Sequence, residues 1–154
     1  MSSNLIKTIL PPATIGIVGG GQLGQMMALI AKSMGYKVGI LDPTPHAPAG
    51  QVADFQIVAE YADVKALMQL AEKSDVLTYE FENVDEGSLL KAKQVAELPQ
   101  GTNLLHITGE RLNEKNFLND AGIPVTKFAA VNDEKTMRAA VETVGYPAIL
   151  KTVS

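Results

Sequence analysis

Three glycines near the N-terminus have the spacing of a phosphate-binding loop. Gly19, Gly21 and Gly24 form the pattern G-x-G-x-x-G between a β-branched apolar stretch and an amphipathic one. Glycine lets the backbone approach an anion closely, and the N–H groups at the start of a helix point toward it. We therefore predict an anion or phosphate site, the alternative being a glycine turn that serves only close packing. A larger side chain at Gly21 should crowd the anion and strain the turn.

A second candidate is the acidic stretch Thr-Tyr-Glu-Phe-Glu-Asn at residues 78–83. If it continues a strand, Thr78, Glu80 and Glu82 project to one side. Carboxylates at the C-terminal end of a central strand lie where open α/β sheets bind ligands, and they can accept hydrogen bonds from ribose hydroxyls or an amine. The alternative is a pair of solvated acids on a loop. Because no partner acid or metal ligand is evident, we assign no catalytic residue.

Asp42 is the third residue of interest, because it follows the glycine pattern by 18 residues at the end of a predicted strand. An acid at about that distance binds the ribose hydroxyls of NAD in dinucleotide-binding folds. Pro43 follows at once, so Asp42 can equally open a turn through its side chain. The sequence leaves both roles open, and the first supports an NAD-dependent oxidoreductase domain as the alternative function.

Alternating elements position these residues. Apolar patterning predicts strands at 13–18, 37–41, 55–58 and 75–79, and helices at 22–34, from a cap at Asp63, and at 86–97. This order predicts an α/β fold with a mostly parallel sheet and helices on both faces. After a break at 98–103, the pattern predicts a helix at 111–121, a strand at 125–131, a helix at 133–144 and a strand at 147–151.

Composition excludes several classes of function. The chain has 154 residues, a formal net charge of −4, two histidines and no cysteine. The absence of cysteine excludes a disulfide scaffold, a thiolate metal site and a cysteine nucleophile, and the distant histidines predict no metal site. The acidic balance argues against nucleic-acid or anionic-membrane binding, and no apolar run approaches the roughly 20 residues that span a bilayer. We expect a cytoplasmic protein.

The combined motifs resemble those of a known family. Gly-Gly-Gly-Gln-Leu-Gly at 19–24, Leu-Asp-Pro at 41–43 and Thr-Tyr-Glu-Phe-Glu-Asn-Val at 78–84 occur in order, followed by Gly-Ile-Pro at 122–124 and Pro-Ala-Ile-Leu-Lys-Thr at 147–152. This set resembles the 5-(carboxyamino)imidazole ribonucleotide synthetases, ATP-grasp enzymes of purine biosynthesis. The resemblance runs from about residue 13 to residue 152 and rests on the glycine and acidic motifs together.

The resemblance implies ATP-dependent carboxylation of 5-aminoimidazole ribonucleotide with bicarbonate, with Mg²⁺ accompanying ATP and a homodimer as the assembled enzyme. It implies a lead-in at 1–12, a Rossmann-like pre-ATP-grasp domain at 13–105, and the incomplete start of an ATP-grasp domain at 106–154. The later magnesium-binding carboxylates and the C-terminal domain of the family are missing. We therefore expect a piece of a longer enzyme that binds phosphoribosyl ligands weakly and does not hydrolyse ATP.

The resemblance also assigns roles to residues. Glu80 would face the ribose hydroxyls, and Arg111 and Lys151 match positions that contact ATP. The 5′-phosphate of the substrate would be held by the glycine loop, residues Gly19, Gly20, Gly21, Gln22, Leu23 and Gly24. The family often has arginine where this chain has Gln25, so one possible phosphate-binding cation is missing.

Overall fold

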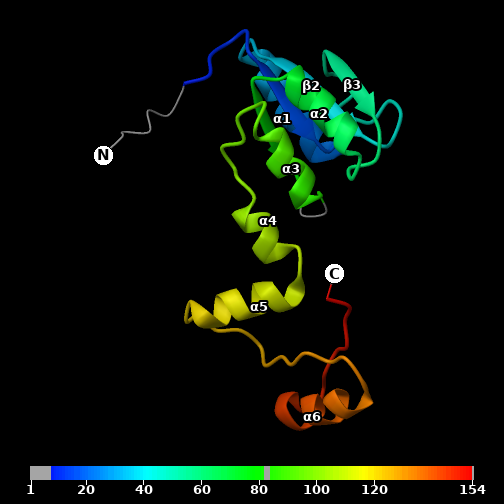
Figure 1. Cartoon of the computed structure of the whole chain (residues 1–154), viewed down its shortest axis with the longest axis vertical. Coiled ribbons are helices and arrows are strands. Elements are labelled where there is room, and N and C mark those ends of the chain that lie inside the picture. Colours follow the sequence, from blue (N-terminus) through cyan, green and yellow to red (C-terminus); the bar gives the residue numbers. More distant parts are fainter. Residues whose placement is uncertain (1–7, 82–83, 154) are drawn as a thin grey trace. The chain divides into compact units, whose positions relative to one another are not determined.

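The structure, a computed structural model, describes residues 8–81 and 84–153. The chain divides into two compact units, residues 1–102 and 103–154. The first contains a sheet and helices, and the described part of the second contains helices alone (Figure 1). Each unit is described by itself.

The first unit is built on a four-stranded parallel sheet in the order β3-β2-β1-β4. The strands are β1 (Thr14–Val18), β2 (Lys37–Asp42), β3 (Phe55–Val58) and β4 (Val76–Tyr79). The predicted parallel α/β sheet is therefore confirmed. Since β1 lies between β2 and β4, whatever follows β1 meets the ends of both neighbours.

Helices cover both faces of this sheet, as the sequence predicts. Ile17 of β1 packs in one cluster with Ala28 and Ala31 of α1 (Gln22–Ser33). The neighbouring Gly16 faces the opposite way, where a Cβ atom would meet Leu70 of α2 (Val64–Glu72). Small residues on these faces let the helix backbones approach the strands closely.

The helix starts and stops follow local signals. The side chain of Asp63 accepts the N–H groups of Lys65 and Ala66, so the predicted cap of α2 is confirmed. α3 (Glu86–Ala92) ends five residues earlier than the predicted 97. The reason is that the backbone of Glu97 pairs with the edge of the sheet, its C=O accepting from Leu77 at 2.7 Å and its N–H donating to Asp75 at 3.2 Å.

The second unit holds α4 (Asn103–Thr108), α5 (Arg111–Asp120) and α6 (Glu134–Val144). The two later helices were predicted, whereas α4 was not. The predicted strands at 125–131 and 147–151 are wrong, because neither segment is a strand in the structure. A strand needs a neighbour to complete its hydrogen bonds, and the described part of this unit contains no strand. Ile149 and Leu150 are accordingly 81% and 72% exposed.

Close packing at Gly39 gives a stability test. A Cβ atom at Gly39 of β2 would overlap the ring of Phe55 in β3. The overlap should cost about 1–3 kcal/mol, which outweighs the gain of about 0.5–1 kcal/mol from removing a strand glycine. We expect Gly39→Ala to lower the free energy of unfolding in urea titrations. The double variant with Phe55→Leu should recover most of the loss, and strictly additive effects would contradict the packing argument.

Candidate functional site

The strand register aligns Gly19, Asp42 and Glu80 at the ends of three adjacent strands. Val18 of β1 is paired with Leu41 of β2 and with Tyr79 of β4. The next residue on each strand is therefore Gly19, Asp42 or Glu80. The pairing continues one step further, because Gly19 N donates to Leu41 O at 2.9 Å and Glu80 N donates to Val18 O at 3.2 Å. The glycine loop and both acids thus meet at the C-terminal edge of the sheet.

Glu80 lies directly against the glycine loop. Its Oε2 accepts the backbone N–H of Gly24 at 2.5 Å. A Cβ atom at Gly19 would overlap the Glu80 side chain, and Gly19 also has a φ of +113°. Only glycine meets both requirements, since the conformation is left-handed and the space is taken. The structure therefore brings Glu80 and the loop together in one half-buried site, beyond the end of β4 and not within it.

Asp42 holds the loop from the other side. The residue is only 5% exposed, and its carboxylate accepts Gly20 N at 2.7 Å, Thr44 N at 2.8 Å and the Tyr61 hydroxyl at 2.6 Å. Burial raises the pKa of Asp42, but the hydrogen bonds from Tyr61, Thr44 and Gly20 together lower it below its usual value. Asp42 therefore turns the chain, as one of the two open interpretations had it, and also fixes the loop.

The remaining donors of the loop point to a site for an anion. The N–H groups of Gly19, Gly20 and Gly24 are used within the fold. Among the described residues, no acceptor pairs with the N–H groups of Gly21, Gln22 and Leu23, which stand at the start of α1. Three adjacent donors at the positive end of a helix suit a phosphate or carboxylate.

The expectation that a side chain at Gly21 strains the turn is wrong. Gly21 has φ −70° and ψ −162°, an extended conformation that any residue adopts. A Cβ atom there would lie 3.1 Å from Glu80 Oε1 and would meet nothing else at close range. A larger side chain at Gly21 is therefore expected to crowd the anion site without straining the backbone.

Tyr61 is a site residue that the sequence did not reveal. It lies in the connection after β3, its hydroxyl donates to Asp42, and its ring meets Phe81 edge to face at 4.7 Å between centroids. Burial, donation to Asp42 and the nearby carboxylates raise its pKa. The one available signal was its place just after a strand whose C-terminal end lies at the site edge.

The other predicted residues lie elsewhere. Arg111 begins α5 in the second unit, and its backbone N–H donates to Val153 O at 2.8 Å, which places the segment of Lys151 beside the start of that helix. Both side chains are exposed. Thr78 donates to Gln100 Oε1 at 2.9 Å, while Glu82 lies outside the described residues.

Gln25, which stands where the family often has arginine, makes its side-chain hydrogen bond outside the glycine loop. Its Nε2 donates to Pro48 O at 2.9 Å, so the amide ties α1 to the proline-rich segment 43–50.

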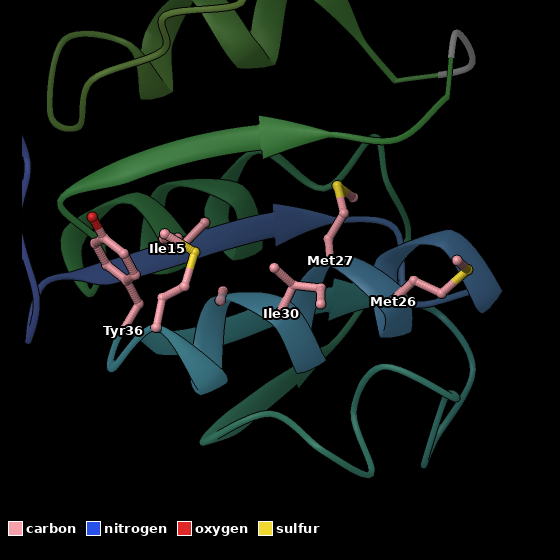
Figure 2. Close-up of a pocket in the computed structure, with 7 residues that line it drawn as sticks. Ile15, Met26, Met27, Ile30 and Tyr36 are labelled. Atoms are coloured by element: carbon pink, nitrogen blue, oxygen red, sulfur yellow. The ribbon is translucent and has the colours of Figure 1, made fainter.

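An apolar hollow on α1 is a poor site for a phosphate. It is an open hollow of about 530 Å³, lined by aliphatic and methionine side chains and by Tyr36 (Figure 2), with Ile15, Met26, Met27 and Ile30 among them. None of its lining residues carries a charge. In the described residues, no three Asp, Glu, His or Cys side chains gather as metal ligands, and no helix is long and apolar enough to cross a membrane.

A comparison with known families identifies the family to which most of the chain belongs. The family model described as "Ribonucleotide synthetase preATP-grasp domain" matches residues 12–108, more than half of the chain. The chain belongs to this family. Because the match contains the sheet, the glycine loop, Asp42 and Glu80, the ribonucleotide synthetase preATP-grasp domain includes the whole candidate site.

Relatives of this preATP-grasp chain include several N5-carboxyaminoimidazole ribonucleotide synthases. The N5-carboxyaminoimidazole ribonucleotide synthase of Bacillus subtilis is 50% identical over 146 residues, which is 95% of this chain and 38% of the relative. A crystal structure of an N5-carboxyaminoimidazole ribonucleotide synthetase with ADP matches 93% of this chain and 38% of its own, at 51% identity and a TM-score of 0.88. The resemblance seen in the sequence is confirmed.

One relative has been solved with two ligands bound. The Aspergillus clavatus enzyme, solved with ADP and 5-aminoimidazole ribonucleotide, matches 88% of this chain and 37% of its own, at 28% identity and a TM-score of 0.78. This chain therefore spans less than two fifths of the length of these relatives.

The role of Asp42 predicts a pH dependence. Because its pKa is lowered on folding, its contribution to stability is complete above the usual value of 3.8 and is lost as the pH falls below it. We expect Asp42→Asn to reduce the free energy of unfolding at pH 7 by about 1–3 kcal/mol, since it weakens bonds to buried donors. In urea titrations, the difference from the unchanged protein should shrink below pH 4. Glu72→Gln, at an exposed acid of α2, is the control, and a constant difference from pH 7 to 3 would contradict this role.

Proposed function

We propose that this chain is part of an enzyme that carboxylates 5-aminoimidazole ribonucleotide with bicarbonate at the expense of ATP. In this proposal the glycine loop holds the 5′-phosphate of the ribonucleotide and Glu80 holds the ribose hydroxyls. The observation that carries it is the row of outward donors at Gly21, Gln22 and Leu23 with the Glu80 carboxylate next to it. The names of the relatives support the choice of substrate. The geometry supports the assignment of the phosphate to the glycine loop and of the ribose hydroxyls to Glu80.

The loop is suited to the phosphate because its donors belong to the backbone. Backbone N–H groups at a helix start need no reorganisation to meet an anion, and the helix dipole adds about 0.3–1 kcal/mol for each negative group there. Gly21 leaves the approach open, since a Cβ atom would come close only to Glu80. The described contacts of this loop are to carboxylates and not to cations, which agrees with the expected weak binding.

Glu80 makes the site selective. A carboxylate next to a phosphate repels it, so bare phosphate is a poor ligand for this loop. A sugar phosphate brings hydroxyl donors to the same carboxylate and offsets that repulsion with charge-assisted hydrogen bonds. The arrangement therefore favours ribose 5-phosphate chemistry over inorganic phosphate.

ATP would engage the second unit. Arg111 and Lys151 are the proposed contacts, because guanidinium and ammonium groups both bind phosphate oxygens. The hydrogen bond from Arg111 N to Val153 O supports this pairing, since it brings the two segments together. The described residues do not gather a magnesium-binding cluster, so no step is assigned to Mg²⁺ here. The homodimer and the cytoplasmic location remain predictions.

The NAD-dependent alternative is not favoured. It requires an acid after β2 that is available to ribose hydroxyls, whereas Asp42 is buried and already accepts three hydrogen bonds. A dinucleotide would have to displace these bonds and with them the anchor of the loop.

The first test of the proposal is Gly21→Ala. The new methyl group should press on Glu80 and narrow the approach to the outward donors while leaving the backbone unstrained. We expect affinity for ribose 5-phosphate, measured by calorimetry at millimolar ligand, to fall about tenfold, which corresponds to about 1.4 kcal/mol.

The matched control is Gly87→Ala in the first turn of α3, where a Cβ atom would lie 3.5 Å from Asp85 and make ordinary contact. Equal affinities in the unchanged protein and Gly21→Ala, or an equal loss in Gly87→Ala, would contradict the assignment of the loop.

The second test is Glu80→Gln, which removes the charge and keeps a hydrogen-bond acceptor for Gly24. We expect the unchanged protein to prefer ribose 5-phosphate over inorganic phosphate. The variant should lose most of this preference, because phosphate is no longer repelled and the hydroxyls meet a neutral partner. Competition titrations with the two ligands measure the ratio, and an unchanged ratio would refute the role of Glu80.

A further inference from the structure

Tyr61 touches both sides of the candidate site. Its hydroxyl donates to Asp42, which follows β2, and its ring meets Phe81, which follows Glu80 after β4. These two strands are not neighbours, since β1 and its glycine loop separate them. We propose that Tyr61 is a positioning residue that fixes the glycine loop relative to Glu80, and so sets the affinity for the sugar phosphate. This inference rests on the proposed function of the loop.

The first arm of this arrangement runs through the hydroxyl. Tyr61 donates to Asp42 Oδ2 at 2.6 Å, and the same oxygen accepts the N–H of Gly20 at 2.7 Å. Thr44 occupies Oδ1 at 2.8 Å. The carboxylate is therefore held from three directions, and its position fixes the backbone of Gly20, one residue before the outward donors begin. Loss of the hydroxyl releases one of these constraints.

The second arm runs through the ring. The Tyr61 and Phe81 rings meet at 68° between planes, an arrangement that aromatic pairs favour. Phe81 is bonded to Glu80, whose carboxylate accepts the N–H of Gly24. The ring contact therefore restrains the chain that carries Glu80, and through it the first turn of α1.

The two arms make different predictions. Tyr61→Phe removes the hydroxyl and keeps the ring, so it should affect Gly20 more than Gly24. Tyr61→Leu removes both, so it should affect Gly20 and Gly24 together. Because the amide proton of each glycine lies in the hydrogen bond concerned, the ¹H–¹⁵N resonances of Gly20 and Gly24 report the two arms separately.

The matched control is Tyr36→Phe. The Tyr36 hydroxyl donates to Ile9 O at 2.9 Å. Tyr36 is also partly buried and lies immediately before β2, at the opposite end of that strand from the site. The variant loses a tyrosine hydroxyl bond, here to a backbone carbonyl and not to a carboxylate, and it has no link to the loop. A general loss of stability would appear in both variants, whereas a positioning effect appears only at Tyr61.

The experiment uses the full chain and ribose 5-phosphate as the probe. We expect Tyr61→Phe to shift the Gly20 resonance and to weaken binding about fivefold, the size of one net hydrogen bond. Tyr61→Leu should also shift Gly24 and weaken binding further, while Tyr36→Phe should change neither resonance nor affinity. Unchanged resonances and affinity in Tyr61→Phe would overturn the inference, as would equal effects in Tyr36→Phe.

Failure of the proposed function gives a distinct result. If the unchanged protein does not bind ribose 5-phosphate, the proposed ligand is wrong, and the resonances alone decide the role of Tyr61. Shifts at Gly20 and Gly24 in the Tyr61 variants would then still show that it positions the loop, and their absence would refute it.

Discussion

Two carboxylates hold the backbone of one loop from opposite sides, and the rest of the site depends on this constraint. Asp42 accepts Gly20 N at 2.7 Å from the β2 side, and Glu80 accepts Gly24 N at 2.5 Å from the β4 side. Both are possible because β1 lies between β2 and β4 in a parallel sheet, so all three strand ends reach one edge. The anchored loop then starts α1 with three backbone donors that have no acceptor among the described residues.

The same constraint governs ligand choice. Donors that a phosphate could use are partly occupied by acids of the chain itself, which lowers affinity for a bare anion. A ligand with hydroxyls beside its phosphate can donate hydrogen bonds to Glu80, which would otherwise only repel the phosphate. Asp42 cannot change roles in this way, since it is buried and its bonds to Thr44 and Tyr61 hold the turn. One acid therefore serves the fold and the other is available to a ligand.

Local patterns predicted the parts of this arrangement that depend on nearby residues. The glycine spacing, the helix predicted at 22–34 and observed at Gln22–Ser33, and the cap at Asp63 are all visible within a few positions of sequence. Tyr61 was missed because its partner Asp42 is 19 residues away, a separation that leaves no local pattern. The strands predicted at 125–131 and 147–151 failed for a related reason, since apolar β-branched residues favour a strand but only a neighbouring strand completes it. The comparisons confirmed the family, while the roles of the site residues remain proposals.

The most direct measurement is a crystal structure of this chain with 5-aminoimidazole ribonucleotide at millimolar concentration. We expect phosphate oxygens at about 2.7–3.2 Å from the backbone nitrogens of Gly21, Gln22 and Leu23. We also expect the ribose hydroxyls to bind the Glu80 carboxylate, with Asp42 still bound to Gly20 and Tyr61. A phosphate seated elsewhere, or hydroxyls bound without Glu80, would contradict it.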